Sequence, residues 1–226
     1  MHHITFYYDP ISPYAYLAFM QLPKALEGLS YSVSYQPILF AGLLKSHGQL
    51  GPAEIAPKRE WTYRQVMWTA KTLGIDCQMP ASHPFNPLPL LRLGAACGAE
   101  QTDGTTCTNR FITQQLFNHV WLDGADAADP VRLERLTQAL AGNIKVDAQA
   151  AKARLKANTD AALQQGCFGV PTLRALRAGA VAGSEKNFWG LDSLPMLREY
   201  LAGDAWFDAG EGWDLAATVG AGIKRT

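Results

Sequence analysis

Apolar and polar positions along the chain predict strands near both ends and helices between them. Residues 4–9 form an apolar run typical of a strand, and residues 31–36 alternate apolar and polar side chains as a second strand would. A helix is expected from Pro13, because the N–H that proline lacks would be unpaired at a first helical position anyway. Pro23 should kink or end this helix early. The chain therefore opens as strand, helix and strand.

The long middle of the chain has a helical pattern and few strand signals. Residues 75–89 contain prolines 80, 84, 87 and 89, which predicts a connecting loop. Helices are predicted over residues 58–73, 89–99, 109–121, 131–141 and 148–165. The helix over residues 148–165 is rich in strong helix formers.

After this middle part the opening pattern resumes. Residues 166–173 (GCFGVPTL) lead towards a last helix over 192–201, which Asp192 or Ser193 can cap and whose first turn accommodates Pro195. The aromatic residues that follow pack either on the body or on a partner chain, and the sequence leaves both open. We therefore divide the chain into a core of residues 1–39 and 166–202, a helical insertion of residues 40–165, and a C-terminal tail of residues 203–226.

Composition and charge exclude several classes of function. The 226 residues are 48% hydrophobic and 18% charged, as in soluble globular proteins. Lys and Arg number 20 against 20 Asp and Glu, and no basic stripe or tail is present, which argues against a nucleic-acid partner. No apolar run reaches about 18 residues, which excludes a membrane-spanning helix. The N-terminus has no secretory signal pattern, so a cytoplasmic location is expected.

The cysteines give no sign of a metal or redox site. Cys77, Cys97, Cys107 and Cys167 form no Cys-x-x-Cys pair, and with 5 scattered histidines they offer no zinc-ligand spacing, so no metal is predicted. We interpret them as free thiols in a reducing compartment, with Cys167 as a packing residue.

The stretch SPYA at residues 12–15 lies where thioredoxin-type proteins carry their redox Cys-x-x-Cys motif, between a strand and a helix. Ser12 and Ala15 occupy the two cysteine positions, which argues against a disulfide oxidoreductase. Ser12 also lies at a helix N-terminus, where unpaired N–H groups and the helix dipole favour an anion. On this fragment alone, simple helix capping is the first interpretation of this serine, and it is compatible with the binding of an anion.

Three stretches in matching order carry a resemblance to a known family. FYYDPISPYAYLA, GCFGVPTL and FWGLDSLPMLREYL are similar to the 2-hydroxychromene-2-carboxylate isomerases and the kappa-class glutathione transferases, both from the DsbA-like branch of the thioredoxin superfamily. Weaker similarity over residues 48–58 and 116–130 extends the resemblance to about residue 202. It implies an α/β, thioredoxin-like (DsbA-like) fold with a large helical insertion between the two halves of the core, and a homodimer.

The resemblance implies glutathione as the cofactor and Ser12 as the catalytic residue. A cysteine at position 12 could form a mixed disulfide with glutathione, whereas a serine cannot, and its O–H can donate to the sulfur. A hydrogen bond to a charged group contributes about 1.5–3 kcal/mol and a helix terminus about 0.3–1 kcal/mol. Together they could lower the thiol pKa by about one to three units. Ser12 is thus expected to stabilise a thiolate and not to act as a nucleophile.

Further glutathione contacts are implied residue by residue. Val170 would pair its backbone with the cysteinyl part of the ligand, and Pro171 would follow a cis peptide bond. Asp192 would meet the γ-glutamyl amine and Ser193 the γ-glutamyl carboxylate, where the family usually has Arg in place of the serine.

Two residues of the insertion complete the predicted glutathione site. Gln49 stands where the family often has Asn, and Lys58 is either a partner of the glycyl carboxylate or a solvated lysine. After Leu173 the chain departs from the compact family hairpin, since residues 174–187 are longer and more polar.

A flat, hydrophobic small-molecule substrate is predicted, with aromatic side chains near the motifs lining its pocket. In the resembling isomerases the glutathione thiolate adds to a ring-opened conjugated ketoacid and leaves after a bond rotation, which implies an isomerase of aromatic degradation. A kappa-like glutathione transferase and a non-catalytic thioredoxin-like binding module remain as alternatives. The substrate-binding candidates are Tyr8, Tyr14, Trp61 and Phe85.

Overall fold

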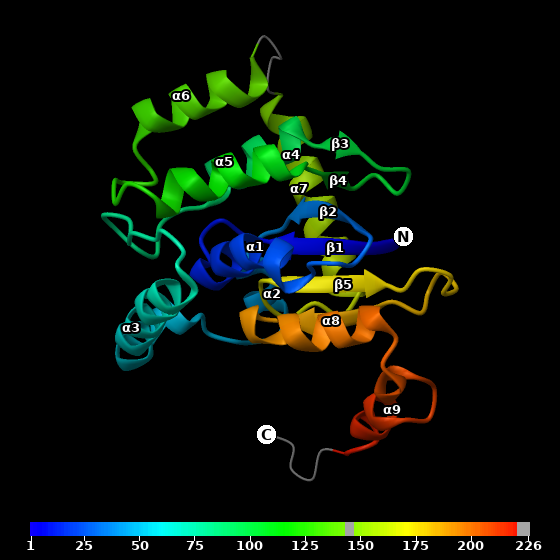
Figure 1. Cartoon of the computed structure of the whole chain (residues 1–226). Helices are drawn as coiled ribbons and strands as arrows, with labels where there is room; N and C mark the ends of the chain where they lie inside the picture. The colour runs from blue at the N-terminus through cyan, green and yellow to red at the C-terminus, as the bar shows by residue number, and fades with distance from the viewer. Residues whose placement is uncertain (143–146, 221–226) are drawn as a thin grey trace.

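A four-stranded sheet lies at the centre of the computed structural model, which describes residues 1–142 and 147–220 (Figure 1). The strand order is β2-β1-β5-β6, with β1 parallel to β2 and antiparallel to β5. Strands from the two ends of the chain therefore pair side by side. The strands are β1 (His2–Tyr8), β2 (Tyr31–Pro37), β5 (Thr172–Leu176) and β6 (Lys186–Trp189).

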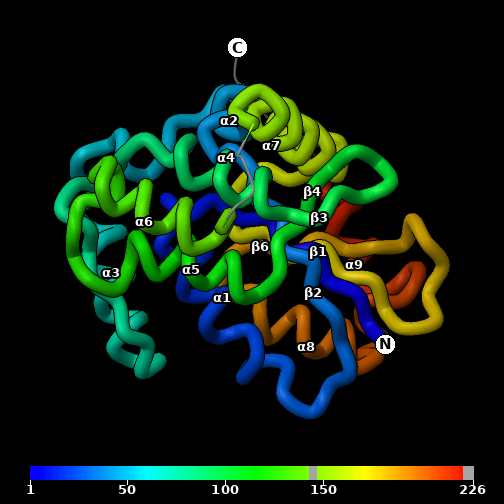
Figure 2. Tube along the Cα trace, turned by 90° about the horizontal axis from the view of Figure 1, so that it is seen from above, coloured from blue at the N-terminus to red at the C-terminus, as the bar shows by residue number. Residues whose placement is uncertain are grey.

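Helices cover both faces of this sheet (Figure 2). Alternate residues of β1 point to opposite faces, so Ile4, Phe6 and Tyr8 pack towards α1 (Pro13–Ala25) and α8 (Leu194–Ala202). Tyr7 faces the other side, where it packs with Leu43 of α2 (Phe40–Ser46) and Ala162 of α7 (Ala148–Gln164).

The insertion is helical, as predicted, and adds elements that the pattern did not reveal. The expected helices begin and end within three residues of α3 (Ala56–Leu73), α4 (Leu88–Cys97), α5 (Arg110–Trp121), α6 (Pro130–Ala141) and α7. The unexpected elements are α2, the 3-10 helix Pro52–Glu54 and the hairpin of β3 (Ala99–Glu100) and β4 (Thr106–Cys107). In the described ranges, no helix is long and apolar enough to cross a membrane.

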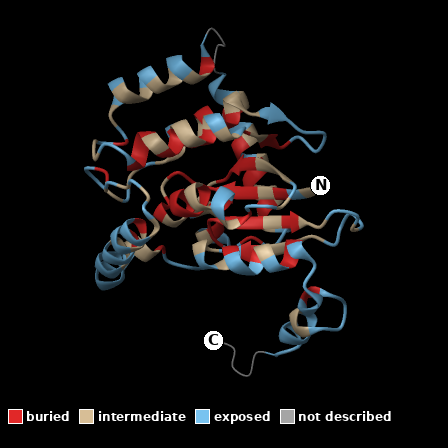
Figure 3. Ribbon diagram, in the orientation of Figure 1, coloured by how far each residue is buried: buried red, intermediate tan, exposed pale blue. Residues whose placement is uncertain are grey.

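An aromatic cluster forms the centre of the core. Phe19 of α1 and Phe117 of α5 have ring centroids 5.3 Å apart, and Tyr8 lies 5.4 Å from Phe117. Each such side chain stabilises the fold by about 1.5–3 kcal/mol through burial. Figure 3 shows the buried residues gathered on the sheet, α1 and α5, whereas α3 buries only Val66 and Ala70.

Two helix ends differ from the sequence expectation. The first helix continues two residues past Pro23, and the Phe19 carbonyl that this proline cannot bond accepts from Arg110 Nη1 at 3.4 Å. The last helix begins at Leu194 after the 3-10 helix Leu191–Ser193. Ser193 provides no cap, because its hydroxyl donates to the Gly190 carbonyl at 2.8 Å.

The tail lies on the body of the molecule. Its 3-10 helix Ala205–Phe207 buries Phe207, and the Trp213 ring of α9 (Gly212–Ala217) lies 5.5 Å from Phe188 of β6. Residues 221–226 of the predicted tail and residues 143–146 of the predicted insertion lie outside the described residues.

Candidate functional site

A large cavity of about 1260 Å³ opens where β1 runs into α1. Its walls come from both halves of the core and from the insertion, including α3, which stands off from the sheet (Figure 1). Core contributions are the β1–α1 turn, residues 168–170 before β5, and the last residue of β6 with residues 190–192 after it. The lining is mainly apolar, so the few polar groups on it define what chemistry is available.

Ser12 lies in this cavity at the N-terminus of α1. Its Oγ accepts from the Ala15 N–H at 3.2 Å, so the capping role is real. The same oxygen donates to the Val170 carbonyl at 3.4 Å, a long hydrogen bond that a better acceptor could replace. The residue is 8% exposed.

The segment facing Ser12 leads into β5. The Val170–Pro171 peptide is cis, as the resemblance implied. Gly169 allows close approach, because a Cβ there would lie 2.5 Å from Nε1 of Trp189. Cys167 is buried, and burial raises the pKa of its thiol to about 12, which agrees with a packing role.

A buried carboxyl group, which sequence reasoning did not single out, holds the turn before Ser12. Asp9 is fully buried, and its two oxygens accept from the N–H groups of Ile11 at 3.1 Å and Phe40 at 3.0 Å. Burial raises its pKa to about 7, against the effect of these two hydrogen bonds. Its place between a strand and the SPYA stretch was the only available signal.

His83 also lines the cavity and was missed. Its Nε2 lies 2.8 Å from the Ile11 carbonyl oxygen, and its Nδ1 lies 2.8 Å from the Tyr63 hydroxyl of α3. Burial lowers the pKa of His83, while the hydrogen bond to Ile11 opposes this shift. The residue lies in the proline-rich loop that the pattern marked only as a connection.

Several predicted residues meet at this cavity. Tyr14 is half-buried, and its hydroxyl donates to Gln65 Oε1 at 2.7 Å. Burial raises the pKa of Tyr14, and the nearby Asp192 carboxylate adds to this. The predicted residues that line the cavity are Ser12, Val170, Asp192, Gln49, Lys58, Tyr14, Trp61 and Phe85.

The polar candidates on the rim are exposed. Asp192, Gln49 and Lys58 are each accessible to solvent, and within the described ranges the Lys58 ammonium forms no ion pair. Trp61 is 63% exposed on α3. These side chains are therefore free to meet a ligand from several sides.

The predicted substrate contact by Tyr8 is wrong. This side chain is fully buried on the core face of β1, and its hydroxyl bonds to Thr108 Oγ1 at 3.1 Å. Pro171 and Ser193 do not line the cavity themselves, although each follows a residue that does.

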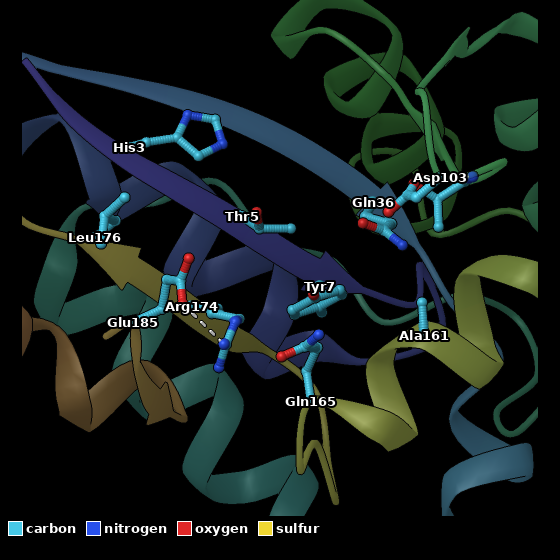
Figure 4. A pocket seen from close by; sticks show the side chains of 11 residues that line it. His3, Thr5, Tyr7, Gln36, Asp103, Ala161, Gln165, Arg174, Leu176 and Glu185 are labelled. Atoms are coloured by element: carbon cyan, nitrogen blue, oxygen red, sulfur yellow. Dashed lines mark hydrogen bonds and ion pairs between the residues drawn. The ribbon is translucent and has the colours of Figure 1, made fainter. Parts of the chain in front are cut away.

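A smaller polar pocket of about 130 Å³ lies on the other face of β1 (Figure 4). His3, Thr5 and Tyr7 face it from the strand, beside the ion pair of Arg174 and Glu185 at 3.0 Å. None of the predicted site residues lines it. In the part of the chain that the structure describes, no cluster of three or more metal-ligating side chains occurs.

Comparison with known proteins places this geometry in a family. A family model described as a DSBA-like thioredoxin domain matches residues 3–202. The chain belongs to this family. A solved structure of 2-hydroxychromene-2-carboxylate isomerase is similar to the DSBA-like chain with a TM-score of 0.66, at 23% identity over 94% of this chain and 98% of that one. The predicted DsbA-like fold is thereby confirmed.

Two of the relatives are similar in sequence over most of their length. The 2-hydroxychromene-2-carboxylate isomerase of Sphingobium xenophagum is 28% identical over 208 residues, which cover 88% of the DSBA-like chain and 97% of the relative. Glutathione S-transferase kappa 1 of Rattus norvegicus is 23% identical over 216 residues, covering 90% and 92%. Both relatives are named as enzymes, in agreement with the enzyme class expected from the sequence.

Proposed function

We propose that the protein is a glutathione-dependent isomerase that acts on a conjugated aromatic ketoacid of the 2-hydroxychromene-2-carboxylate type. The observation that carries this is the position of Ser12, whose hydroxyl lies at a helix N-terminus in a large apolar cavity. The isomerases among the relatives support the reaction class.

The residues around Ser12 fit a bound thiolate. The hydroxyl donates a long hydrogen bond to the Val170 carbonyl, so its proton can turn towards a sulfur at little cost. The start of α1 adds a favourable field for negative charge. With a hydrogen bond of about 1.5–3 kcal/mol to the anion, these groups could hold a thiol ionised near neutral pH. When bound, glutathione would supply the thiolate that adds to the ketoacid and leaves after bond rotation.

The rest of the cavity supports a tripeptide beside a flat substrate. Asp192 is assigned to the γ-glutamyl amine and Lys58 to the glycyl carboxylate. The Gln49 amide is assigned a further hydrogen bond to the ligand. Val170 is assigned the backbone contact to the cysteinyl part, with Pro171 and Ser193 shaping the adjoining segments. Tyr14, Trp61 and Phe85 are assigned to the substrate.

A kappa-like glutathione transferase is the second candidate, because a kappa-class transferase is among the relatives of matching length. Both reactions need the same thiolate, so Ser12 does not discriminate between them. Product analysis does: an isomerase returns free glutathione with a rearranged ketoacid, and a transferase releases the conjugate. A cytoplasmic homodimer with a role in aromatic degradation belongs to the same proposal and rests on the resemblance.

The first test is the ultraviolet difference absorbance of the thiolate during titration with glutathione at neutral pH. The native protein should give a thiolate signal, and the ratio of thiolate to thiol should fall about tenfold or more in Ser12→Ala, since one pKa unit corresponds to about 1.4 kcal/mol. Ser12→Thr, which keeps a hydroxyl, should retain part of the signal.

Loss of the helix cap alone must not explain the result. Asn109→Ala is the matched control, because Asn109 caps α5 through a 2.9 Å bond to the Ile112 N–H and does not line the cavity. It should keep the full thiolate signal. An unchanged signal in Ser12→Ala removes Ser12 from the mechanism, and no signal in any protein leaves a non-catalytic binding module.

A further inference from the structure

Two ring N–H groups hold the turn that carries Ser12. Trp121 Nε1 of α5 donates to the Pro10 carbonyl at 2.9 Å, and His83 Nε2 donates to the Ile11 carbonyl at 2.8 Å. The indole and imidazole rings also contact each other, with centroids 5.7 Å apart. Two side chains thus hold the turn: the Trp121 indole, which does not titrate, and the His83 imidazole, which does.

The second nitrogen of His83 has a hydrogen-bond pattern that depends on its charge. The Tyr63 hydroxyl lies 2.8 Å from Nδ1 and 2.7 Å from the His83 carbonyl oxygen. A hydroxyl has one proton, so beside a neutral ring it can donate either to Nδ1 or to the carbonyl oxygen. In the contact without a proton, the lone pairs of the two acceptor atoms face each other. In the imidazolium form, Nδ1–H donates to the hydroxyl and the hydroxyl donates to the carbonyl.

We propose that His83 is a positioning residue whose charged form closes a continuous chain of hydrogen bonds from α3 through His83 to the turn at Ile11, and that a thiolate held at Ser12 favours this charged form. The second half of the proposal rests on the proposed function. The first half concerns the free protein and stands alone.

Several charged and titratable groups surround His83. Burial lowers the pKa of His83 and so favours the neutral ring in the free protein. Tyr63 is the titratable group in contact with it, and the Arg59 cation near Tyr63 on α3 opposes a second positive charge. Asp9, two residues before Ile11, is the acidic group on the turn itself. From the other elements, Trp121 of α5 and Phe85 contribute uncharged rings. Residues 9–14 of the turn contain no cationic side chain, whereas Lys58 and Arg198 line the cavity elsewhere.

Nuclear magnetic resonance of the labelled histidine rings tests the first half. Tyr63→Phe removes two hydrogen bonds from the charged form and one from the neutral form, so the pKa of His83 should fall by about one unit. A rise in this pKa would mean that Tyr63 serves the neutral ring, and would overturn the proposal. His83→Gln identifies the signal by removing it.

His119 is the matched control. It is buried, and its Nε2 lies 3.0 Å from the Ala127 carbonyl oxygen, but it does not line the cavity. Its titration should be unchanged in Tyr63→Phe. An equal shift at both histidines would indicate a general change in packing and would contradict the specific hydrogen-bond chain.

Ligand titration tests the second half. Saturating glutathione should raise the pKa of His83 by about half a unit or more, whereas S-methylglutathione, which has no ionisable thiol, should not. If thiolate absorbance appears and the pKa does not move, the coupling is wrong. If no thiolate appears, the proposed function fails and the coupling fails with it, but the sign of the Tyr63→Phe shift still decides the first half.

Discussion

At the scale of single residues, Asp9 links the cavity to the pH dependence of stability. Its pKa is raised from 3.8 to about 7 in the folded protein, so the folded state binds more protons than the unfolded state between these values. The free energy of unfolding should therefore fall as pH rises from about 4 to about 7, with a slope of up to about 1.4 kcal/mol per pH unit from this group. Denaturant unfolding at several pH values should show a flatter slope in Asp9→Asn. An unchanged slope would mean that folding does not raise the pKa of Asp9.

Single residues also mark the boundary of what the sequence could predict. Ser12 was recognisable because a strand, a proline and a helical pattern fix its place at a helix N-terminus. Tyr8 was misplaced because the parity of β1 turns it into the core, although it lies four residues from Ser12. His83 was invisible, since its partners Ile11 and Tyr63 are 72 and 20 residues away in the chain.

At the scale of elements, one buried amide joins three segments. Asn158 of α7 is fully buried, accepts from the Thr106 N–H at 2.7 Å, and donates to the Pro37 and Thr106 carbonyls at 2.9 Å each. Asn158→Ala leaves these backbone groups unpaired, at about 1–3 kcal/mol each, so the free energy of unfolding should fall by about 3 kcal/mol or more. Gln149→Ala, at an exposed position of the same helix, should change it by less than about 0.5 kcal/mol. Equal effects in the two variants would show that Asn158 has no special role.

Elements with a local periodic pattern could be predicted, whereas those held by distant contacts such as Asn158 could not. The long helices of the insertion follow a period that local sequence reveals, and their ends match within three residues. The β3–β4 hairpin has two residues in each strand and depends on Asn158 and on the bridge between Tyr35 and Thr108, which are distant in sequence. Short elements held by such tertiary contacts carry no periodic signal.

At the scale of the whole molecule, the two ends of the chain share one sheet, and the tail packs against β6 and α8. Arg177 follows β5, and its guanidinium donates to the carbonyls of Tyr200 and Asp204 and to the Asp208 carboxylate. Phe207 is buried, with ring centroids 5.4 Å from Tyr200 and 6.0 Å from Phe188. Phe207 therefore belongs to the main hydrophobic core together with Phe188 of β6. The residues that follow β6, 190–192, line the cavity.

This continuity predicts that the tail and the core unfold together. Phe207→Ala should lower the free energy of unfolding by about 3–5 kcal/mol, the usual cost of removing a buried phenylalanine, and shift the midpoints of tryptophan fluorescence and far-ultraviolet circular dichroism equally. Leu215→Ala on the exposed side of α9, 60% accessible, is the control and should change little. If Phe207→Ala instead produced an early fluorescence transition while circular dichroism kept its midpoint, the tail would be a separate unit. The cavity would then owe its shape to residues 1–202 alone.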